Sequence, residues 1–398
     1  MPLQTNTCRV TIIKINSWGL NMEKLIENID RAAKYDLDNN KIFGACYYVY
    51  HNGNILEKCY GPTTLNSNEP ITNSTLFRLA SMTKPITTVA ALILVERGLL
   101  NLDDCITKYL PEFKDIKIID EAGNVSIPKK LPTIRSLLTH SSGIATNITS
   151  KYEKMTKEDR ATLDSAIAFY IKTGLDFEPE SAQAYSGTGA FNVLTKIMQM
   201  ITGEDLLSFL QREVFKPCDM IDTTFLPTKE QEKRMVAMHR HADGKNTVYE
   251  MAKDCIFEEF PKTLFLGGAG LVSTLKDYCN FAKMLLNKGK TDNGNIIISE
   301  QSIKMLSSPQ LTEEIMPGCA RWGFGVRVIV DDTHATPKGC FGWSGAYGSH
   351  FWIDPSNNLF AVYLKNSKGP GGGSDIFESS RNFEQAVYSA LNKKEFFL

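Results

Sequence analysis

The stretch Phe77-Arg78-Leu79-Ala80-Ser81-Met82-Thr83-Lys84-Pro85 is the most informative part of the chain, because it holds a serine and a lysine spaced as Ser-x-x-Lys. On a helix, residues three positions apart share a face, so the lysine amine can reach the serine hydroxyl. Proline is tolerated only in the first turn of a helix, so Pro85 predicts that the helix cannot begin much before Ser81. We therefore expect Ser81 at a helix N-terminus, where backbone N–H groups lack partners within the helix.

That position suits a serine that acts as a nucleophile. The Ser81 N–H is free to donate to an oxyanion, and the positive end of the helix dipole stabilises that anion. The same field, together with burial, can lower the pKa of Lys84 toward that of a usable base. The tetrapeptide alone is weak evidence, because the chain holds a second copy, Ser273-Thr274-Leu275-Lys276. We interpret that copy as the cap that opens a helix over 278–286.

Two further motifs support the first copy. Tyr185-Ser186-Gly187-Thr188-Gly189 is a glycine-rich loop before an expected helix. A phenol beside a lysine ammonium can be held partly as phenolate and can shuttle a proton to a leaving group. Gly342-Trp343-Ser344-Gly345-Ala346-Tyr347-Gly348 leads into an expected strand, where small residues let a substrate lie along the sheet edge. There the Ala346 N–H is a candidate second donor to an oxyanion.

Strands are expected near both ends of the chain, with helices between them. Alternating or β-branched residues predict two hairpins and one further strand, at 43–60 (turning at Asn52-Gly53), 350–364 and 323–330. Apolar residues at helical spacing predict helices that begin near Met22 and over 86–94, 191–201 and 375–392. This order predicts one sheet interrupted by a helical lobe.

With 398 residues, the chain exceeds the size at which a single core keeps growing, so we expect two lobes. An α/β lobe is predicted to combine residues 22–80 and 263–398. A mostly helical lobe over 81–262 would carry Ser81, Lys84 and Tyr185. Residues 1–21 are interpreted as a dispensable extension.

Charge and hydropathy exclude several classes of partner. Lys and Arg total 44 against 45 Asp and Glu, which gives no electrostatic reason to expect nucleic acid or an anionic membrane. No apolar run approaches the roughly 20 residues that cross a bilayer. We recognise no signal peptide in residues 1–21, so a cytoplasmic location is expected. The sequence predicts no oligomeric state.

Neither cysteines nor histidines are arranged as a metal site. The nine cysteines are scattered, form no CxxC pair and are odd in number, so reduced buried thiols are expected rather than zinc ligands or a disulfide framework. His239 and His241 have no third ligand nearby and are interpreted as surface residues. His140 is interpreted as a structural residue at a helix end, and Arg78 and Arg321 as ion-paired scaffold. No metal or organic cofactor is expected.

These motifs together resemble the superfamily of class C β-lactamases, penicillin-binding proteins and family VIII carboxylesterases. The stretches 76–84, 134–143, 185–189, 267–271 and 342–348 match in the family's order, and the resemblance runs from about Met22 to the C-terminus. It implies an antiparallel sheet flanked by helices and a mostly helical lobe, with the active site between them. It also implies Ser81 as nucleophile, Lys84 and Tyr185 as the acid/base pair, and the Ser81 and Ala346 amides as the oxyanion hole.

Two departures from the β-lactamase pattern bear on the substrate. The tyrosine motif has Gly187 where β-lactamases have an asparagine that holds an acylamide, and the third motif begins with Trp343 instead of lysine. Losing a charge-assisted contact forfeits about 1.5–3 kcal/mol of binding to a charged substrate. With Ser344 and Gly345, Trp343 is similar to the Trp-x-Gly form of family VIII esterases. We therefore expect hydrolysis of a small acyl ester.

Two alternatives remain open. One is an amide-directed activity, as in a β-lactamase, a D-amino-acid peptidase or a penicillin-binding carboxypeptidase. The other is a non-catalytic binding module on the same fold. The residues also leave open whether Lys84 or Tyr185 takes the first proton, because coupled groups titrate together.

Overall fold

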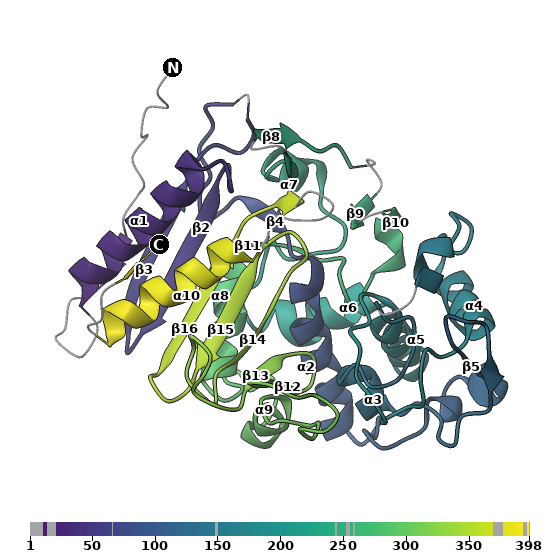
Figure 1. Ribbon diagram of the computed structural model, residues 1–398. Helices are drawn as coiled ribbons and strands as arrows, with labels where there is room; N and C mark the ends of the chain where they lie inside the picture. The colour runs from purple at the N-terminus through teal and green to yellow at the C-terminus, as the bar shows by residue number, and fades with distance from the viewer. Residues whose placement is uncertain are drawn as a thin grey trace.

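The computed structural model describes residues 11–13, 21–65, 67–147, 150–242, 245–251, 255–257, 259–368, 377–392 and 396–397. A large antiparallel sheet has helices on both of its faces, and further helices pack beside it (Figure 1). This mixed arrangement confirms the predicted fold class, an antiparallel sheet flanked by helices.

The main sheet has eight strands in the order β1-β3-β2-β16-β15-β14-β13-β12, and every neighbouring pair is antiparallel. Its strands are β1 (Thr11–Ile13), β2 (Ala45–His51), β3 (Asn54–Tyr60), β12 (Ala320–Trp322), β13 (Arg327–Ile329), β14 (Phe341–Ser344), β15 (His350–Asp354) and β16 (Leu359–Leu364). Both predicted hairpins are confirmed as β2–β3 and β15–β16. Strand β2 pairs directly with β16, so one sheet joins the two ends of the chain.

The prediction of a single strand over 323–330 is wrong in detail. The chain turns at Phe324-Gly325, where the Gly323 N–H donates to the Val326 carbonyl at 2.9 Å. Gly325 has a φ of +65°, a conformation that glycine adopts without strain. The segment is therefore the turn and second strand of a β12–β13 hairpin.

Helices cover the two faces of the sheet. Helices α1 (Met22–Asp38) and α10 (Glu378–Leu391) pack together on one face, and α8 (Leu275–Leu286) packs on the other. Side chains alternate along a strand, so in β15 Trp352 joins the α1–α10 core while Phe351 and Ile353 join the opposite core. The sheet thus separates two hydrophobic cores.

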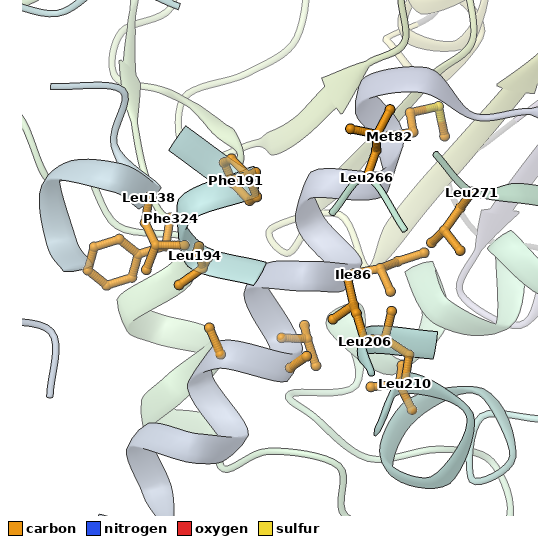
Figure 2. Close-up of a cluster of buried hydrophobic side chains, with 14 of the residues drawn as sticks. Met82, Ile86, Leu138, Phe191, Leu194, Leu206, Leu210, Leu266, Leu271 and Phe324 are labelled. Carbon is orange, nitrogen blue, oxygen red and sulfur yellow. The ribbon is translucent and has the colours of Figure 1, made fainter. Parts of the chain in front are cut away.

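Helix α2 (Thr83–Glu96) is the centre of the larger core. Twelve of its fourteen residues are buried, and it contacts helices α5 (Gly189–Thr202), α6 (Leu206–Leu210) and α9 (Glu300–Leu306). Figure 2 shows Met82 and Ile86 beside Leu206, Leu210, Leu266 and Leu271, with Phe191 and Leu194 nearby. Truncating one such leucine to alanine costs about 2–5 kcal/mol, so this packing holds the helix start firmly in place.

Most other helices follow α2 in the chain. They are α3 (Ile134–Leu138), α4 (Leu163–Thr173), α5 (Gly189–Thr202), α6 (Leu206–Leu210), α7 (Lys229–Lys233) and, later, α9 (Glu300–Leu306). The remaining strands form small sheets: β4 (Leu76–Arg78) with β11 (Val272–Thr274), β5 (Ile118–Ile119) with β6 (Val125–Ser126), β9 (Cys255–Phe257) with β10 (Phe260–Pro261), and β7 (His239–Ala242) with β8 (Lys245–Val248) and β17 (Ser367–Lys368). Among the described residues, no helix is long and apolar enough to cross a membrane.

Part of the predicted extension belongs to the main sheet. Residues 11–13 form the edge strand β1, which pairs with β3 from Thr11 opposite Glu57 to Ile13 opposite Ile55. Residues 1–10 and 14–20 of the extension lie outside the described residues. Deleting residues 1–21, which the sequence predicts to be dispensable, would therefore remove an edge strand of the main sheet.

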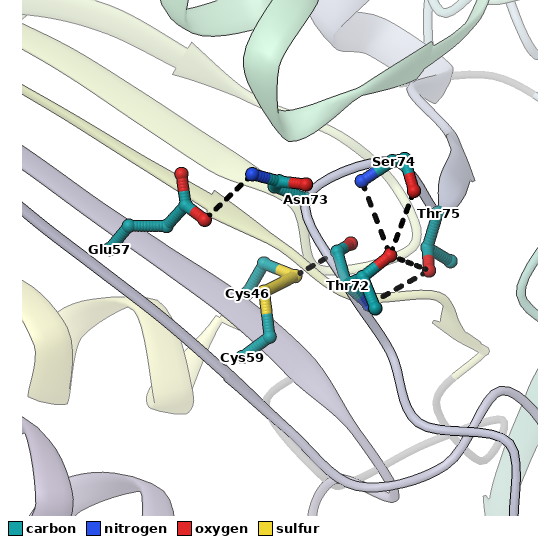
Figure 3. Close-up of a disulfide and its surroundings, with 7 residues drawn as sticks. All are labelled: Cys46, Glu57, Cys59, Thr72, Asn73, Ser74 and Thr75. Carbon is teal, nitrogen blue, oxygen red and sulfur yellow. Dashed lines mark hydrogen bonds between the residues drawn. A yellow bond between two sulfur atoms is a disulfide. The ribbon is translucent and has the colours of Figure 1, made fainter. Parts of the chain in front are cut away.

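The expectation that all cysteines are reduced is wrong for one pair. Cys46 and Cys59 form a disulfide between β2 and β3 (Figure 3). The Asn52-Gly53 turn sets a register in which these two cysteines lie directly opposite each other. Disulfides are rare in reducing compartments, so the bond weakens the basis for the expected cytoplasmic location. Cys218, Cys279 and Cys340 are buried thiols, as predicted.

Candidate active site

Ser81 lies in a tight turn between a short strand and the central helix. Strand β4 ends at Arg78, a 3₁₀ turn spans Ala80–Met82, and α2 begins at Thr83. The helix therefore begins as Pro85 predicts, with the proline in its first turn. Ala80 adopts a φ of +47°, an uncommon conformation for alanine that the surrounding buried packing holds in place. Ser81 is almost fully buried, with 6% of its surface exposed.

The Lys84 amine is buried among carbonyl groups. It donates to the carbonyls of Gly187 at 2.6 Å and Gly268 at 2.9 Å, and lies 3.4 Å from Ser81 Oγ. Burial lowers the pKa of Lys84 well below the usual lysine value. A neutral amine has two N–H groups and one lone pair, so the two carbonyls orient the lone pair toward Ser81. This environment suits a base.

The Tyr185 hydroxyl donates to Ser81 Oγ at 2.6 Å. Burial raises the pKa of Tyr185 to about 12, although the hydrogen bond to Ser81 acts in the opposite direction. The phenol is therefore protonated at neutral pH, and the expectation that it is held partly as phenolate is wrong. The reason is that burial also lowers the pKa of Lys84, so its amine offers little positive charge to stabilise a phenolate. This environment suits an acid.

His140 supports the loop that carries Tyr185. It follows α3 directly, is buried, and accepts a hydrogen bond on Nδ1 from the Ser186 N–H at 3.1 Å. Its ring centroid lies 4.6 Å from that of Tyr185. Burial and the nearby Lys84 lower the pKa of His140 well below its usual value, so the ring is neutral. These contacts agree with its interpretation as a structural residue.

Strand β14 brings the third motif to the site. The Trp343 ring lies 5.4 Å from the Tyr185 ring, between ring centroids. A Cβ on Gly345 would lie 2.3 Å from the Leu79 carbonyl oxygen, so only glycine lets β14 approach the Ser81 turn this closely. Ala346 follows as an exposed residue. Within the described part of the chain, neither the Ser81 nor the Ala346 N–H donates a hydrogen bond, so both are available to an oxyanion.

Gly187 leaves open space where β-lactamases have an asparagine. A Cβ built on Gly187 would have no atom within 4 Å. Its carbonyl nevertheless binds Lys84, so the backbone at this position holds the amine while the missing side chain enlarges the site.

Sequence reasoning missed Trp322. This buried residue of β12 lies with its ring centroid 4.6 Å from Trp343 and 4.4 Å from His140, and its indole N–H donates to Gln183 at 3.1 Å. Trp322 therefore joins Trp343, Tyr185 and His140 in one aromatic wall. A tryptophan in a short strand gives no local signal of such a role, because the contacts come from three distant segments.

The other predicted positions lie outside this constellation. Ser273 is buried beside the N-cap Thr274 of α8, so the second Ser-x-x-Lys copy is a helix start as interpreted. His239 is buried against Phe43, with ring centroids 3.7 Å apart, so the prediction of a surface residue is wrong. Arg78 binds the Val236 carbonyl rather than a carboxylate, and Arg321 lies 3.5 Å from Glu313. The described residues contain no cluster of metal-ligating side chains.

A nucleophile-type serine at a helix start, joined to a buried lysine and a tyrosine beside an antiparallel sheet, defines the class of β-lactamase-like serine enzymes. The comparisons agree with this class. The Beta-lactamase family model matches residues 29–378, and the chain belongs to that family.

The chain is similar to both uncharacterised and named proteins. It is 30% identical over 353 residues to Uncharacterized protein MT1414 of Mycobacterium tuberculosis, covering 82% of this chain and 86% of that protein. It is 28% identical to Esterase EstB of Burkholderia gladioli, covering 94% and 97%. The solved structure of EstCE1, a hydrolase with promiscuous acyltransferase activity, shares the fold with a TM-score of 0.77 at 21% identity, covering 92% and 99%. The protein is a serine hydrolase.

Proposed function

We propose that this protein hydrolyses a small, neutral acyl ester through an acyl-enzyme on Ser81. The observation that carries the proposal is the hydrogen-bonded chain in which Tyr185 donates to Ser81 Oγ and Lys84 lies on its other side. The pKa is lowered for Lys84 and raised for Tyr185. These opposite shifts favour proton transfer from Ser81 to Lys84 and proton donation by Tyr185. A neutral base and a protonated acid flank one hydroxyl.

The first half of the proposed reaction forms the acyl-enzyme. Lys84 accepts the Ser81 proton as Oγ attacks the carbonyl carbon, and the N–H groups of Ser81 and Ala346 donate to the resulting oxyanion. When the intermediate collapses, the bond to the leaving oxygen breaks. The Tyr185 hydroxyl protonates the leaving alcohol, and the proton that Lys84 took from Ser81 then passes to the Tyr185 phenolate.

The second half releases the acid. Water attacks the acyl carbon and gives its proton to the Tyr185–Lys84 pair, and Ser81 leaves with a proton from the same pair. The carboxylic acid departs and the starting protonation states return. Neither half consumes or requires a cofactor.

Two features favour an uncharged ester as substrate. Trp343 presents an indole where a lysine would attract a carboxylate, and it lies among Trp322 and Tyr185 rather than beside a cation. Gly187 has open space in place of a side chain, so it lacks the amide that would hold an acylamide. The similarity to Esterase EstB points the same way.

A fluorophosphonate probe tests whether Ser81 is the nucleophile. We expect labelling of the wild type and of Ser273→Ala, a matched control in the second Ser-x-x-Lys copy, and no labelling of Ser81→Ala. An unlabelled wild type would favour the alternative of a non-catalytic binding module. Labelling that persists in Ser81→Ala would overturn the assignment.

Parallel assays separate the ester proposal from the amide alternative. We expect a short-chain p-nitrophenyl ester to give a higher kcat/KM than a chromogenic cephalosporin. A cephalosporin turned over faster than the ester would instead support a β-lactamase or a related amide-directed enzyme.

A further inference from the structure

A pocket opens on the face of the sheet that α10 covers. It is lined by side chains of β13, β14, β15 and α10, among them Arg327, Ser344, His350 and Glu384. Gly342 lies between Arg327 and Trp352 in the strand register, and a Cβ on it would lie 2.1 Å from the Phe351 carbonyl oxygen, so only glycine fits at this point of the pocket wall. Trp343 faces Tyr185, and its neighbours alternate to the opposite face, so this pocket lies behind the Ser81 site.

A hydrogen-bonded chain fixes one wall of the pocket. Ser344 Oγ lies 2.8 Å from His350 Nδ1, and His350 Nε2 lies 2.9 Å from a carboxylate oxygen of Glu384. In the neutral ring, Nε2–H donates to Glu384 and Nδ1 accepts from Ser344. Glu384 is the acidic side chain that lines the pocket, and one of its carboxylate oxygens contacts His350.

Arg327 has no comparable partner. Among the described residues, it takes part in no ion pair and no hydrogen bond, and its Nε is buried. A buried guanidinium N–H without an acceptor is unfavourable, because it has lost its water without gaining another partner. The arginine fork therefore lines an open pocket with its donors unused.

A second donor lies beside it. His334 also lines the pocket, and its Nδ1 accepts from the Thr336 N–H at 3.1 Å. The neutral His334 ring therefore carries its proton on Nε2, which can act as a donor. Arg327 and His334 together offer donors to an oxygen-rich ligand.

We propose that this pocket binds a small monocarboxylate, with Arg327 as its principal partner. A planar guanidinium matches a planar carboxylate in a two-bond arrangement. Arg327 is the single formal cation among the lining residues, and Glu384 places a negative charge nearby. A ligand with one negative charge is thus favoured over a dianion such as phosphate, which Glu384 would repel. Nothing in this proposal depends on the reaction at Ser81.

Thermal unfolding in the presence of sodium acetate or propionate tests the proposal. At constant ionic strength, we expect either salt to raise Tm along a saturating curve, with a dissociation constant on the order of 1 mM. Sodium chloride should have no such effect, and phosphate a smaller one. Arg327→Met should abolish the shift. Arg97→Gln is the control, because Arg97 pairs with Glu213 outside the pocket, and this variant should retain the shift.

The same variant separates ligand binding from a structural role. Because Arg327 has no partner in the described chain, Arg327→Met should unfold at the wild-type temperature or above it when no carboxylate is present. If this variant does not fold, Arg327→Lys keeps the charge but loses the fork, and should bind acetate more weakly. An acetate shift unchanged in these variants, a stronger effect of phosphate, or no saturable shift with either carboxylate would overturn the proposal.

Discussion

The Tyr185 hydroxyl lies 2.6 Å from Ser81 Oγ, closer than the Lys84 amine at 3.4 Å, although 104 residues separate the tyrosine from the serine. The Tyr185 pKa is raised and the Lys84 pKa is lowered, so the tyrosine is shifted toward its protonated, donating form and the lysine toward its neutral, accepting form. The two groups are therefore not equivalent. In the proposed mechanism Lys84 is therefore the first base, a choice that the sequence left open.

The first prediction concerns the acid. Tyr185→Phe removes the hydroxyl but keeps the ring, so kcat for an ester should fall by about 10²–10⁴-fold with little change in KM. Steady-state kinetics measure both constants. Tyr170→Phe is the matched control, since Tyr170 is also buried and its hydroxyl accepts from Asn192 at 2.9 Å. Equal losses in the two variants would mean that Tyr185 matters only for packing.

The second prediction concerns the buried amine and pH. The folded pKa of Lys84 lies below its unfolded value, so between the two the unfolded chain binds more protons and stability rises with pH. The burial penalty is complete below the folded pKa and disappears above the unfolded pKa, about 10.4. Lys84→Met removes the titration. Its stability relative to wild type should therefore decrease as pH rises from neutral toward 10.

Urea unfolding of both proteins across this pH range measures the difference. Lys276→Met is the control from the second Ser-x-x-Lys copy, because Lys276 is exposed. That variant should show a difference from wild type that does not depend on pH. A pH-independent difference for Lys84→Met as well would mean that Lys84 is not held neutral.

Local sequence signals were sufficient for much of the fold and the centre of the site. Pro85 fixed where the helix could begin, and the Asn52-Gly53 turn fixed the first hairpin. The same turn also sets Cys46 opposite Cys59, so the disulfide could have been recognised by extending the hairpin register. Counting cysteines without that register led to the wrong prediction.

Other features depend on tertiary contacts that a single sequence does not reveal. Trp322 reaches the site only because the β12–β13 hairpin folds back beside β14. His239 is buried because Phe43, from a distant segment, packs on its ring. The phenol of Tyr185 was expected to be held partly as phenolate, but the degree of burial, which is the main cause of its raised pKa, follows from the whole fold.

The third prediction separates support from proton transfer. His140→Ala loses the hydrogen bond to the Ser186 N–H and the contact with the Tyr185 ring, so kcat should fall by roughly tenfold. Because His140 is neutral throughout the working range, the midpoint of the acidic limb of the kcat/KM profile should not move. A limb that disappears in His140→Ala would instead identify His140 as a base.

The last prediction addresses specificity at Trp343. Trp343→Lys restores the cation of the β-lactamase motif and removes the indole that packs against Trp322 and Tyr185. A charge-assisted hydrogen bond is worth about 1.5–3 kcal/mol, so kcat/KM for a cephalosporin carboxylate should rise by roughly tenfold or more relative to that for a neutral ester. Trp343→Leu, which stays apolar but is smaller, should lower activity on the ester without improving the cephalosporin. If the lysine and leucine variants gave the same ratio of kcat/KM values, the charge at this position would not determine the substrate, and the preference for neutral esters would have to come from the open space at Gly187.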